Sequence, residues 1–571
     1  MKKEWVLLKP DPKRISFLSQ SLNISPLLAT LLVNRGIDEL HEARPFLFGD
    51  FKDLPSPFLM KDMKKAVDRI LRAMEAHESI YIYGDYDVDG VTATSNFINF
   101  FKELGITVGF HIPHRLREGY GLHVEALKEI QKKGGKVVIT ADCGISNVKE
   151  AIAASELGID LIITDHHIVP PELPDAHAVL NPLRKDSDFP DHYLAGVGVA
   201  FHLMMALRHT LRERGYFQSR KEPNLKNYLD LVALGTIADM VPLKGANHIL
   251  VKEGLKILSS QRRMGIKALI EVSNIKKDTI GTYEVAFQLA PRLNAGGRLA
   301  SAELGVKLLT TSDALTALEL AQRLDSENSQ RRFLQEEVLE QAIHMIEKDQ
   351  LGKNKSLVLS SPLWHPGVIG IVASKLVERY YRPTCLIAEQ ENIGKGSCRS
   401  IESLHLLDAL KECAGYFGNF GGHKAAAGFS IPLQNISAFR DQFEKVVSQR
   451  LTDSDFFPKV KVDMELTLKD VQASLLEDIE KLAPFGMGCP EPLFVSRDFH
   501  VQRAQLVGQK HLKLFLEGED RYHEAIGFHM GHAFSEVAKL KGILYSPAFN
   551  DWQGKRSIQL KLKDLLFDAP Q

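Results

Sequence analysis

The sequence has little that would cross-link the chain or hold it in a membrane. Only five cysteines occur in 571 residues, and no two form a C-x-x-C pair, which disfavours a disulfide framework and a thiolate zinc site. No run of about 18 apolar residues is present. The N-terminal stretch MKKEWVLLKPDPKR has an apolar core too short for a signal peptide. We therefore expect a soluble, cytoplasmic protein with no membrane partner.

The chain also lacks an excess of charge of either sign. Lys and Arg number 71 and Asp and Glu number 72, which gives a formal net charge of −1. This balance argues against a histone-like or tail-driven nucleic-acid binder. A polyanionic partner would have to be met by a local basic patch.

Short apolar stretches alternate with amphipathic ones in the first part of the chain. After a helix-like stretch at 61–79, the predicted strands occupy residues 80–85, 107–113, 136–144, 159–167 and 176–182. Strands and helices that alternate at this spacing predict a parallel, doubly wound α/β sheet. Ligands of such sheets lie at the carboxyl ends of the strands.

The rest of the sequence predicts a connector and two further units. Residues 313–347 contain no Gly or Pro and have helical periodicity, which indicates a long helix. From about residue 455, shorter β-like runs indicate a small barrel or sandwich. The expected domains are an N-terminal arm (1–50), a catalytic α/β domain (51–270), a connector with the long helix (271–350), a second α/β domain (351–450) and a C-terminal β-barrel (451–571).

Carboxylates and imidazoles are concentrated at the polar ends of the predicted strands. Gly90 and the helix-like VTATSNFINF behind it indicate that the chain bends after the first three aspartates. The complete set is Asp85, Asp87, Asp89, Asp142, Asp165, His166, His167 and Asp239.

Taken singly, each member of this set has a structural explanation. An aspartate at a strand-to-helix turn is most often a helix cap, and a lone histidine is most often structural. If all of them converge at one sheet edge, however, they cannot all ionise without cations, and hard divalent ions are the natural counterions. Two such ions suit in-line attack on a phosphoryl group, so the set predicts phosphoester or phosphoanhydride hydrolysis.

Several motifs resemble those of known phosphoesterases. DYDVDG, ADCG, TDHH and GTIAD match the DHH phosphoesterases, and GGHKAAAGF matches the glycine-rich motif of their associated domain. HRLREGYGL, QLAPRLNAGGRL, WHPGVIGIVASKL, GSCRS and PFGMGCPEPLF extend the resemblance to the RecJ family of single-strand-specific exonucleases, over roughly residues 50–500. The resemblance implies a parallel-sheet DHH domain, joined by a long helix to a DHH-associated α/β domain, and a C-terminal β-barrel of the OB-fold.

The resemblance also implies roles for the residues at the strand ends. It assigns two Mn²⁺ or Mg²⁺ ions to Asp87, Asp89, Asp142, His166 and Asp239, with Asp142 as the bridge. Asp85 and Asp165 are then further ligands or supports of the ligands. His167 would steer the scissile phosphate or the attacking water, or would only orient His166.

An exonuclease also needs a site for the end of the strand. The resemblance assigns this site to Arg115, Tyr120, Arg298, Ser397, Arg399 and His423. On spacing alone, each arginine would be a surface ion-pair residue, and the glycine-rich stretch before His423 would be a tight turn. In the C-terminal unit, basic residues interleaved with aromatic ones suit single-strand binding by an OB-fold, or else form the aromatic core of a small barrel.

Together these implications describe a 5′–3′ exonuclease that releases 5′ mononucleotides from single-stranded DNA in recombination and repair. The expected partners are a single-strand-binding protein and a helicase, and the expected state is a monomer. One alternative is a DHH phosphodiesterase for oligoribonucleotides or cyclic dinucleotides, which needs no C-terminal barrel. Another is a non-catalytic replication scaffold of the same fold. Missing metal ligands would mark that case, and here none is missing.

Overall fold

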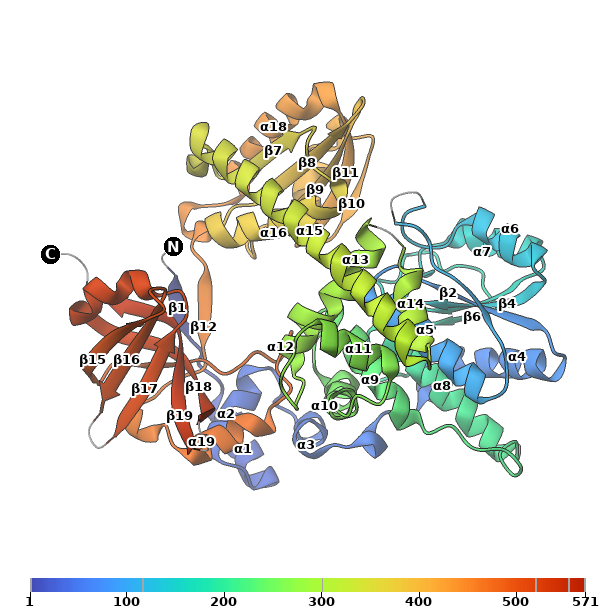
Figure 1. Cartoon of the computed structure of the whole chain (residues 1–571), viewed down its shortest axis with the longest axis horizontal. Coiled ribbons are helices and arrows are strands. Elements are labelled where there is room, and N and C mark those ends of the chain that lie inside the picture. Colours follow the sequence, from blue (N-terminus) through green and yellow to red (C-terminus); the bar gives the residue numbers. More distant parts are fainter. Residues whose placement is uncertain (1–2, 116–117, 300, 519–520, 553–554, 569–571) are drawn as a thin grey trace. The chain divides into compact units, whose positions relative to one another are not determined.

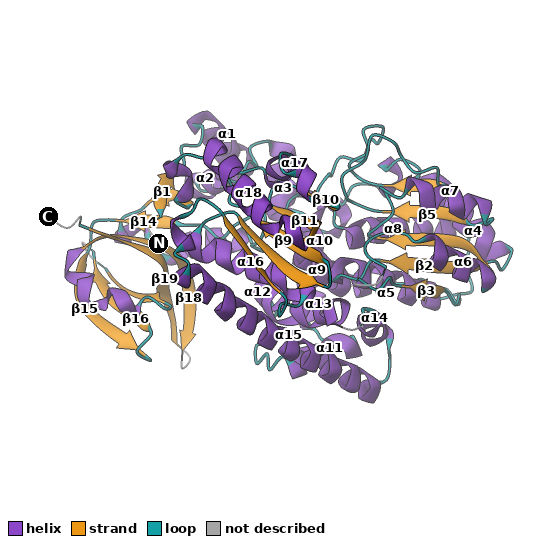
Figure 2. Ribbon diagram, turned by 90° about the horizontal axis from the view of Figure 1, so that it is seen from above, coloured by secondary structure: helices purple, strands orange, loops and turns teal. Residues whose placement is uncertain are grey.

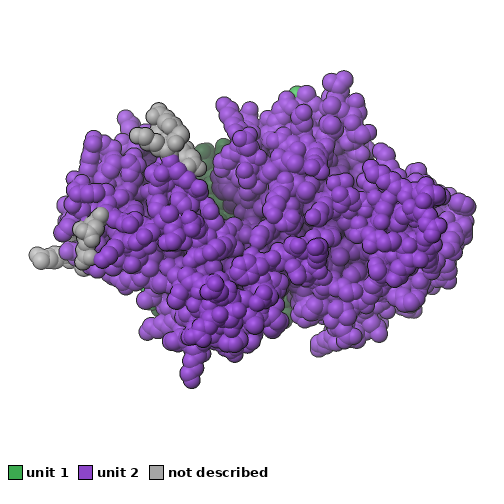
Figure 3. Space-filling model, turned by 90° about the horizontal axis from the view of Figure 1, so that it is seen from below, with its two compact units in different colours: residues 1–5, 292–302, 322–460 green, residues 6–291, 303–321, 461–571 purple. Residues whose placement is uncertain are grey.

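The computed structural model describes residues 3–115, 118–299, 301–518, 521–552 and 555–568. The chain divides into two compact units, coloured in Figure 3. Unit 1 contains residues 1–5, 292–302 and 322–460, and unit 2 contains residues 6–291, 303–321 and 461–571.

The first sheet of unit 2 is entirely parallel, as its alternating sequence predicts. Its strand order is β3-β2-β4-β5-β6, so β2 and β4 lie inside it. The strands are β2 (Ser79–Gly84), β3 (Gly109–His111), β4 (Gly135–Ala141), β5 (Asp160–Thr164) and β6 (Ala178–Leu180).

Side chains of this sheet alternate between two apolar cores. Along β4, Val137 and Ile139 face one core and Val138 faces the other. This alternation follows from the two-residue period of a strand, and burial on both faces is typical of parallel sheets. Figure 1 shows α6 (Val124–Lys132) and α7 (Val148–Glu156) on one side of the sheet, and α4 (Met63–Glu75), α5 (Val88–Glu103) and α8 (Gly196–Glu213) on the other.

Further helices of unit 2 precede and follow the sheet. They are α1 (Pro12–Leu22), α2 (Pro26–Asn34), α3 (Leu40–Phe48), α9 (Leu229–Ala238), α10 (Gly245–Ser259), α11 (Met264–Val272), α12 (Thr282–Glu284), α14 (Glu303–Thr310) and α19 (Ala473–Lys481). The region predicted as an N-terminal arm is thus largely helical. Its Arg35 and Asp463 form an ion pair (Nη1 to Oδ1, 3.1 Å) in which both side chains are buried.

The C-terminal part of unit 2 is a seven-stranded sheet in the order β13-β14-β18-β19-β17-β16-β15. Figure 2 shows its strands strongly curved, in keeping with the predicted small β domain. The strands are β13 (Met464–Glu465), β14 (Phe494–Ser496), β15 (His500–Val507), β16 (His511–Glu517), β17 (Tyr522–Gly527), β18 (Leu540–Trp552) and β19 (Lys555–Phe567). A two-stranded sheet pairs β1 (Glu4–Leu7) with β12 (Lys459–Val462).

Unit 1 is built on a mixed five-stranded sheet in the order β10-β11-β9-β8-β7. Helix α16 (Pro366–Tyr380) packs on one face, and α17 (Leu406–Lys411) and α18 (Ile436–Arg450) on the other. The strands are β7 (Leu357–Ser361), β8 (Thr384–Gln390), β9 (Ile393–Arg399), β10 (Asn419–Gly422) and β11 (Ala426–Pro432).

Two helices contribute residues to both units. They are α13 (Ala290–Leu299) and α15 (Ala314–Lys348), the latter being the long helix predicted over 313–347. Within unit 1, Val338, Ala342 and Ile346 of α15 pack against α16 and the sheet. In the part of the chain that the structure describes, no helix is both long enough and apolar enough to cross a bilayer.

Candidate metal centre

Three aspartates occupy equivalent positions just beyond the ends of neighbouring strands. The backbone N–H of Asp85 donates to Ala141 O (3.1 Å), that of Asp142 to Thr164 O (3.0 Å), and that of Asp165 to Leu180 O (3.1 Å). Each residue therefore continues the ladder of its parallel strand by one hydrogen bond. This pattern places the three carboxylates along one sheet edge, as the sequence predicts for a ligand site.

The other two aspartates of GDYDVDG lie on a helix rather than on a strand. Strand β2 ends at Gly84 and α5 begins at Val88, so the chain bends before Asp87 and not after Asp89 as predicted. Asp87 is the N-cap of α5, and its Oδ1 accepts from Gly90 N at 3.0 Å. Its capping role, a common one for aspartate, does not occupy Oδ2.

Asp89 is held by the first turn of another helix. Its Oδ2 accepts from Gly196 N (2.6 Å) and its Oδ1 from Val197 N (2.8 Å), at the start of α8. A helix N-terminus stabilises a carboxylate through its free amides and its dipole. Burial nevertheless raises the Asp89 pKa to about 7, with the neighbouring Asp87 adding to the effect.

Asp142 is buried without any hydrogen bond to its carboxylate. Among the described residues, neither of its oxygens has a hydrogen-bond partner, and the same holds for Asp85 Oδ1. The backbone of Asp142 has a φ of +69°, a left-handed conformation that aspartate tolerates better than most residues. Gly196 makes room for the carboxylate, because a Cβ there would lie 2.5 Å from Asp142 Oδ1.

The Nε2 of His166 faces this group of carboxylates. Its Nε2 lies 3.2 Å from Asp142 Oδ1, 3.4 Å from Asp239 Oδ2 and 3.8 Å from Asp89 Oδ2. Burial, followed by repulsion from His167, lowers the pKa of His166 to about 4. A buried, neutral imidazole whose Nε2 has no hydrogen-bond partner and faces several carboxyl groups is a suitable ligand for a divalent cation.

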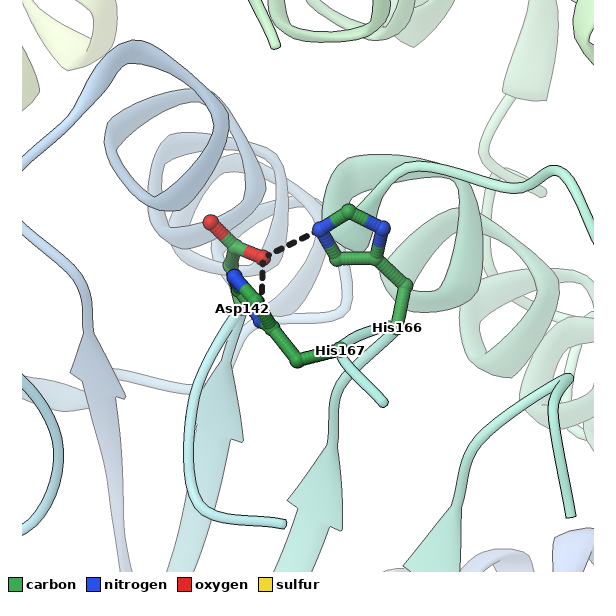
Figure 4. Close-up of side chains that lie close together, drawn as sticks. All are labelled: Asp142, His166 and His167. Atoms are coloured by element: carbon green, nitrogen blue, oxygen red, sulfur yellow. Dashed lines mark ion pairs between the residues drawn. The ribbon is translucent and has the colours of Figure 1, made fainter. Parts of the chain in front are cut away.

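The ligand atoms form three groups, each with all atoms within 4.8 Å of one another. Two groups share no residue: Asp89, His166 and Asp239 form one, and Asp85, Asp87 and Asp142 form the other. The third joins Asp142 with His166 and His167, and Figure 4 shows both imidazoles directed at one oxygen of Asp142. Asp142 thus belongs to one triad and also lies close to His166 of the other. The donor set of these two triads, five carboxylates and one imidazole, suits Mn²⁺ or Mg²⁺.

Asp85, Asp142 and Asp239 are, like Asp89, costly to ionise in the metal-free protein. Burial is the main cause for Asp85, Asp142 and Asp239, and neighbouring aspartates add to it. The pKa of Asp239, at the C-cap of α9, is raised to about 9, and the pKa values of Asp85 and Asp142 are raised well above the ordinary value. Buried carboxylates that cannot ionise alone are the expected counterpart of bound cations.

His167 has the opposite character to His166. Its Nδ1 lies 2.7 Å from Asp165 Oδ1 and 3.1 Å from the hydroxyl of Tyr120. Burial opposes its protonation, but the hydrogen bond and charge of Asp165 outweigh burial and raise the His167 pKa to about 9. Asp165 also accepts from the backbone N–H groups of Ile145, His166 and His167, so it faces His167 rather than the two triads.

Arg115 lies beside the same centre in unit 2. Its guanidinium carbon is 4.9 Å from the centroid of the Tyr86 ring, and Tyr86 lies between Asp85 and Asp87 in the chain. Together with Tyr120, which contacts His167, Arg115 is one of two predicted strand-binding residues that flank the metal ligands.

The other four predicted strand-binding residues belong to unit 1. Arg298 Nη1 donates to Gly367 O in the first turn of α16 (3.2 Å), and Arg399 Nη1 donates to Ser397 Oγ (3.3 Å). His423 is exposed in the turn between β10 and β11, where its backbone N–H donates to Ala426 O (2.8 Å). The glycine-rich stretch before it is therefore strand β10 and the tight turn of a β-hairpin.

Sequence reasoning missed three residues that contribute to the centre. Gly196 and Val197 fix Asp89, although they lie 107 and 108 positions away from it. The only sequence signal was the small-residue stretch AGVGVA before a helix, which is common in ordinary packing. Tyr86 was also missed, because an aromatic residue inside an acidic motif indicates no partner by itself.

Three family models match the chain. The one described as "DHH family, N-terminal domain" matches residues 79–236, "DHHA1 domain" matches residues 353–449 and "RecJ OB domain" matches residues 462–564. The predicted fold class, with an OB-fold in the C-terminal part, is confirmed.

Curated relatives and solved structures agree with these models. The single-stranded-DNA-specific exonuclease RecJ of Bacillus subtilis is 38% identical over 569 residues, which cover 99% of this chain and 71% of the relative. The Escherichia coli protein of the same name is 35% identical over 559 residues, covering 95% and 96%. The crystal structure of RecJ in complex with Mn²⁺ from Thermus thermophilus matches with a TM-score of 0.83 at 29% identity, covering 100% of this chain and 80% of that one. For the complex with Mg²⁺, the TM-score is 0.77 at 28% identity, with coverage of 100% and 79%.

Proposed function

The chain belongs to the RecJ family of single-stranded-DNA-specific exonucleases, and from this premise we propose that it degrades single-stranded DNA from the 5′ end and releases 5′ mononucleotides. It is an enzyme that hydrolyses phosphodiester bonds with Mn²⁺ or Mg²⁺ as cofactor. The observation that carries the proposal is the presence of two ligand triads that share no residue. They contain buried oxygen and nitrogen atoms, of Asp85, Asp142 and His166, that have no hydrogen-bond partner in the described chain. Two divalent ions side by side are a recurrent arrangement for in-line displacement at phosphorus.

We assign the two ions to Asp87, Asp89, Asp142, His166 and Asp239, with Asp142 between them. When bound, such ions polarise the scissile phosphate and lower the pKa of the attacking water. The protein keeps the ligands in place beforehand, because Asp89 is fixed by α8 and Asp142 by the end of β4. Asp85 completes the second triad as a further ligand or as a support for Asp87 and Asp142.

His167 is assigned to the scissile phosphate. Asp165 holds Nδ1 and favours the protonated ring, so Nε2–H is available as a charged donor. A charged donor aimed at a phosphoryl oxygen stabilises the charge that develops in the transition state. Asp165 accordingly serves to position and charge His167 rather than to bind metal.

The end of the strand is assigned to six residues. The guanidiniums and hydroxyls among them are donors that suit a terminal phosphate and its neighbour, and arginine can bind a phosphate through two parallel hydrogen bonds. The residues are Arg115, Tyr120, Arg298, Ser397, Arg399 and His423. The OB domain would hold the rest of the strand by stacking and by contacts with the backbone.

The decisive experiment compares the purified full chain with Asp142→Ala on end-labelled substrates in Mn²⁺. Wild-type protein should release labelled mononucleotides from 5′-labelled single-stranded DNA, and should leave a blunt duplex and short RNA largely intact. Asp142→Ala should lose at least about a hundredfold in rate, because Asp142 belongs to one triad and also lies beside His166 of the other. Asp188→Ala, at an exposed aspartate of the same unit, is the matched control and should be fully active.

Two results would contradict the proposal. Equal activity of Asp142→Ala would show that the triads are not the reaction centre. Preferential cleavage of short RNA would favour the oligoribonucleotide phosphodiesterase, and binding of DNA without cleavage would favour the scaffold.

The cellular setting belongs to the same proposal. A single-strand exonuclease in the cytoplasm of a bacterium would act in DNA recombination and repair. It would require a helicase to supply single strands and would meet a single-strand-binding protein on them. We propose that it does so as a monomer.

A further inference from the structure

The first turn of α16 lies against the strand-end residues of unit 1. Gly370 is on the side of this helix that faces β9, where Ser397 and Arg399 share one face of the sheet because they are two positions apart. Figure 2 shows α16 running along the sheet that contains β9. The intervening Cys398 points into the core on the opposite face.

A side chain at position 370 would meet both donors. A Cβ built there would lie 2.8 Å from Ser397 Oγ and 3.1 Å from Arg399 Nη2. The contact below 3.0 Å forces the Ser397 hydroxyl to shift, and the tight contact at 3.1 Å requires the Arg399 guanidinium to give way by a few tenths of an ångström. The backbone of Gly370 has no left-handed φ, so conformational freedom does not explain the glycine.

The two donors are also linked to each other. Arg399 Nη1 donates to Ser397 Oγ (3.3 Å) and to Cys398 O (2.8 Å), which orients the guanidinium along β9. Moving either side chain therefore moves the other. An added methyl group at position 370 would change the geometry of the pair rather than of one residue.

We infer that Gly370 determines specificity for a terminal phosphate, because the missing side chain leaves room for Ser397 and Arg399 to lie side by side with their donors directed at the phosphate. The inference rests on the proposed function, since it concerns the same strand end. It assigns Gly370 as a positioning residue that acts through Ser397 and Arg399. A 5′-hydroxyl end has no phosphate for these donors, so the missing side chain matters only for phosphorylated ends.

The test measures kcat/KM of the full chain on one single-stranded DNA sequence with either a 5′-phosphate or a 5′-hydroxyl. Wild-type protein should favour the phosphorylated end. Gly370→Ala should reduce this preference by about tenfold, the effect of weakening one or two hydrogen bonds to a charged group. Because the preference is a ratio measured on one preparation, a lower fraction of folded protein cancels.

Gly415→Ala is the matched control. Gly415 belongs to the same unit, and a Cβ there would meet nothing within 4 Å, so the preference should stay at the wild-type value. In a Ser397→Ala/Arg399→Ala background, Gly370→Ala should have no further effect on the preference, because both of the groups that it displaces are already removed.

The possible failures are distinguishable. If wild-type protein does not degrade single-stranded DNA, the proposed function fails. If it does so but Gly370→Ala keeps the wild-type preference, or lowers both rates equally, the inference on Gly370 is overturned while the exonuclease stands. A wild-type enzyme indifferent to the terminal phosphate would overturn the inference as well.

Discussion

At the scale of single residues, the metal centre is a group of carboxylates that resist ionisation until cations neutralise them. Asp89 and Asp239 have pKa values raised to about 7 and about 9. An unfolded aspartate has a pKa of about 4. Between these values the unfolded chain releases protons that the folded, metal-free chain retains, so the unfolded state gains stability as pH rises.

We therefore predict that the metal-free protein becomes less stable between about pH 4 and pH 9, by an amount on the order of a few kcal/mol. Saturating Mn²⁺ should remove most of this loss, because bound cations favour the ionised form. Unfolding by denaturant at pH 5.5 and pH 8.5, with a chelator or with Mn²⁺, measures the effect.

Asp142→Asn provides the control for this prediction. The amide cannot ionise, so the metal-free variant should be more stable than wild type at pH 8.5 and should gain little from Mn²⁺. Equal stability of variant and wild type in the chelator would show that the Asp142 carboxylate carries no such cost.

At the scale of elements, a turn of the C-terminal region contacts the segment that follows Asp239, one of the proposed metal ligands. Asp239 caps α9, and four residues later Leu243 N donates to Met487 O (2.8 Å). Gly488, with a φ of +71°, packs so closely that a Cβ there would lie 2.9 Å from Pro242. Both contacts lie within unit 2, so this turn and the metal centre belong to one compact body.

We predict that Gly488→Ala weakens Mn²⁺ binding roughly fivefold, equivalent to about 1 kcal/mol of lost support for the Asp239 segment. Gly508→Ala is a close control. Gly508 also has a positive φ, +55°, but a Cβ there would meet nothing within 4 Å. Both variants place alanine at a left-handed φ and share the resulting backbone strain. A difference between their Mn²⁺ affinities therefore reports the close contact that the Cβ at position 488 makes with Pro242. Equal affinities of the two variants would refute a bracing role.

Elements with a strong period were the predictable ones. The parallel strands follow from short apolar stretches that alternate with amphipathic ones along the chain. Helix α15 follows from the helical periodicity of residues 313–347 and from their lack of Gly and Pro. The start of α5 was placed too late, because Asp87 caps the helix and Gly90 is tolerated inside it. The support of Asp89 by α8 could not be predicted, since it joins residues 107 positions apart and leaves no local pattern. The ligand set itself remains a prediction.

At the scale of the whole molecule, a net charge of −1 means that attraction to DNA depends on local arrangement. Arg115 is stacked on Tyr86 beside the acidic centre, and in the proposed function its charge offsets the carboxylates for an incoming phosphate. The balanced charge of the sequence excluded a protein with a large excess of basic residues. It could not identify Arg115, because the position of this side chain depends on its contact with the Tyr86 ring.

We predict that Arg115→Ala reduces the salt dependence of single-stranded DNA binding. If Arg115 neutralises one phosphate, the slope of log K against log salt should fall by about 0.7 in magnitude. The measurement uses Asp142→Ala protein, which binds without degrading the DNA. Arg220→Ala is the control, because Arg220 stacks in the same way on Tyr216 (4.4 Å) and its removal changes the net charge equally. An equal change of slope in both variants would indicate a bulk charge effect.

The grip of α8 on Asp89 has a consequence for ion selectivity. Both oxygens of Asp89 are fixed by backbone amides, whereas those of Asp142 have no hydrogen-bond partner in the described chain. With the proposed ligand set, adjustment to an ion of different radius would therefore come from Asp142, while Asp89 stays in place. A cage that is stiff on one side fits Mn²⁺ and Mg²⁺, with ligand distances near about 2.1 Å, better than Ca²⁺, which takes six to eight ligands at about 2.3–2.6 Å in flexible sites. By holding Asp89 in place, the start of α8 would thus favour small divalent ions over Ca²⁺.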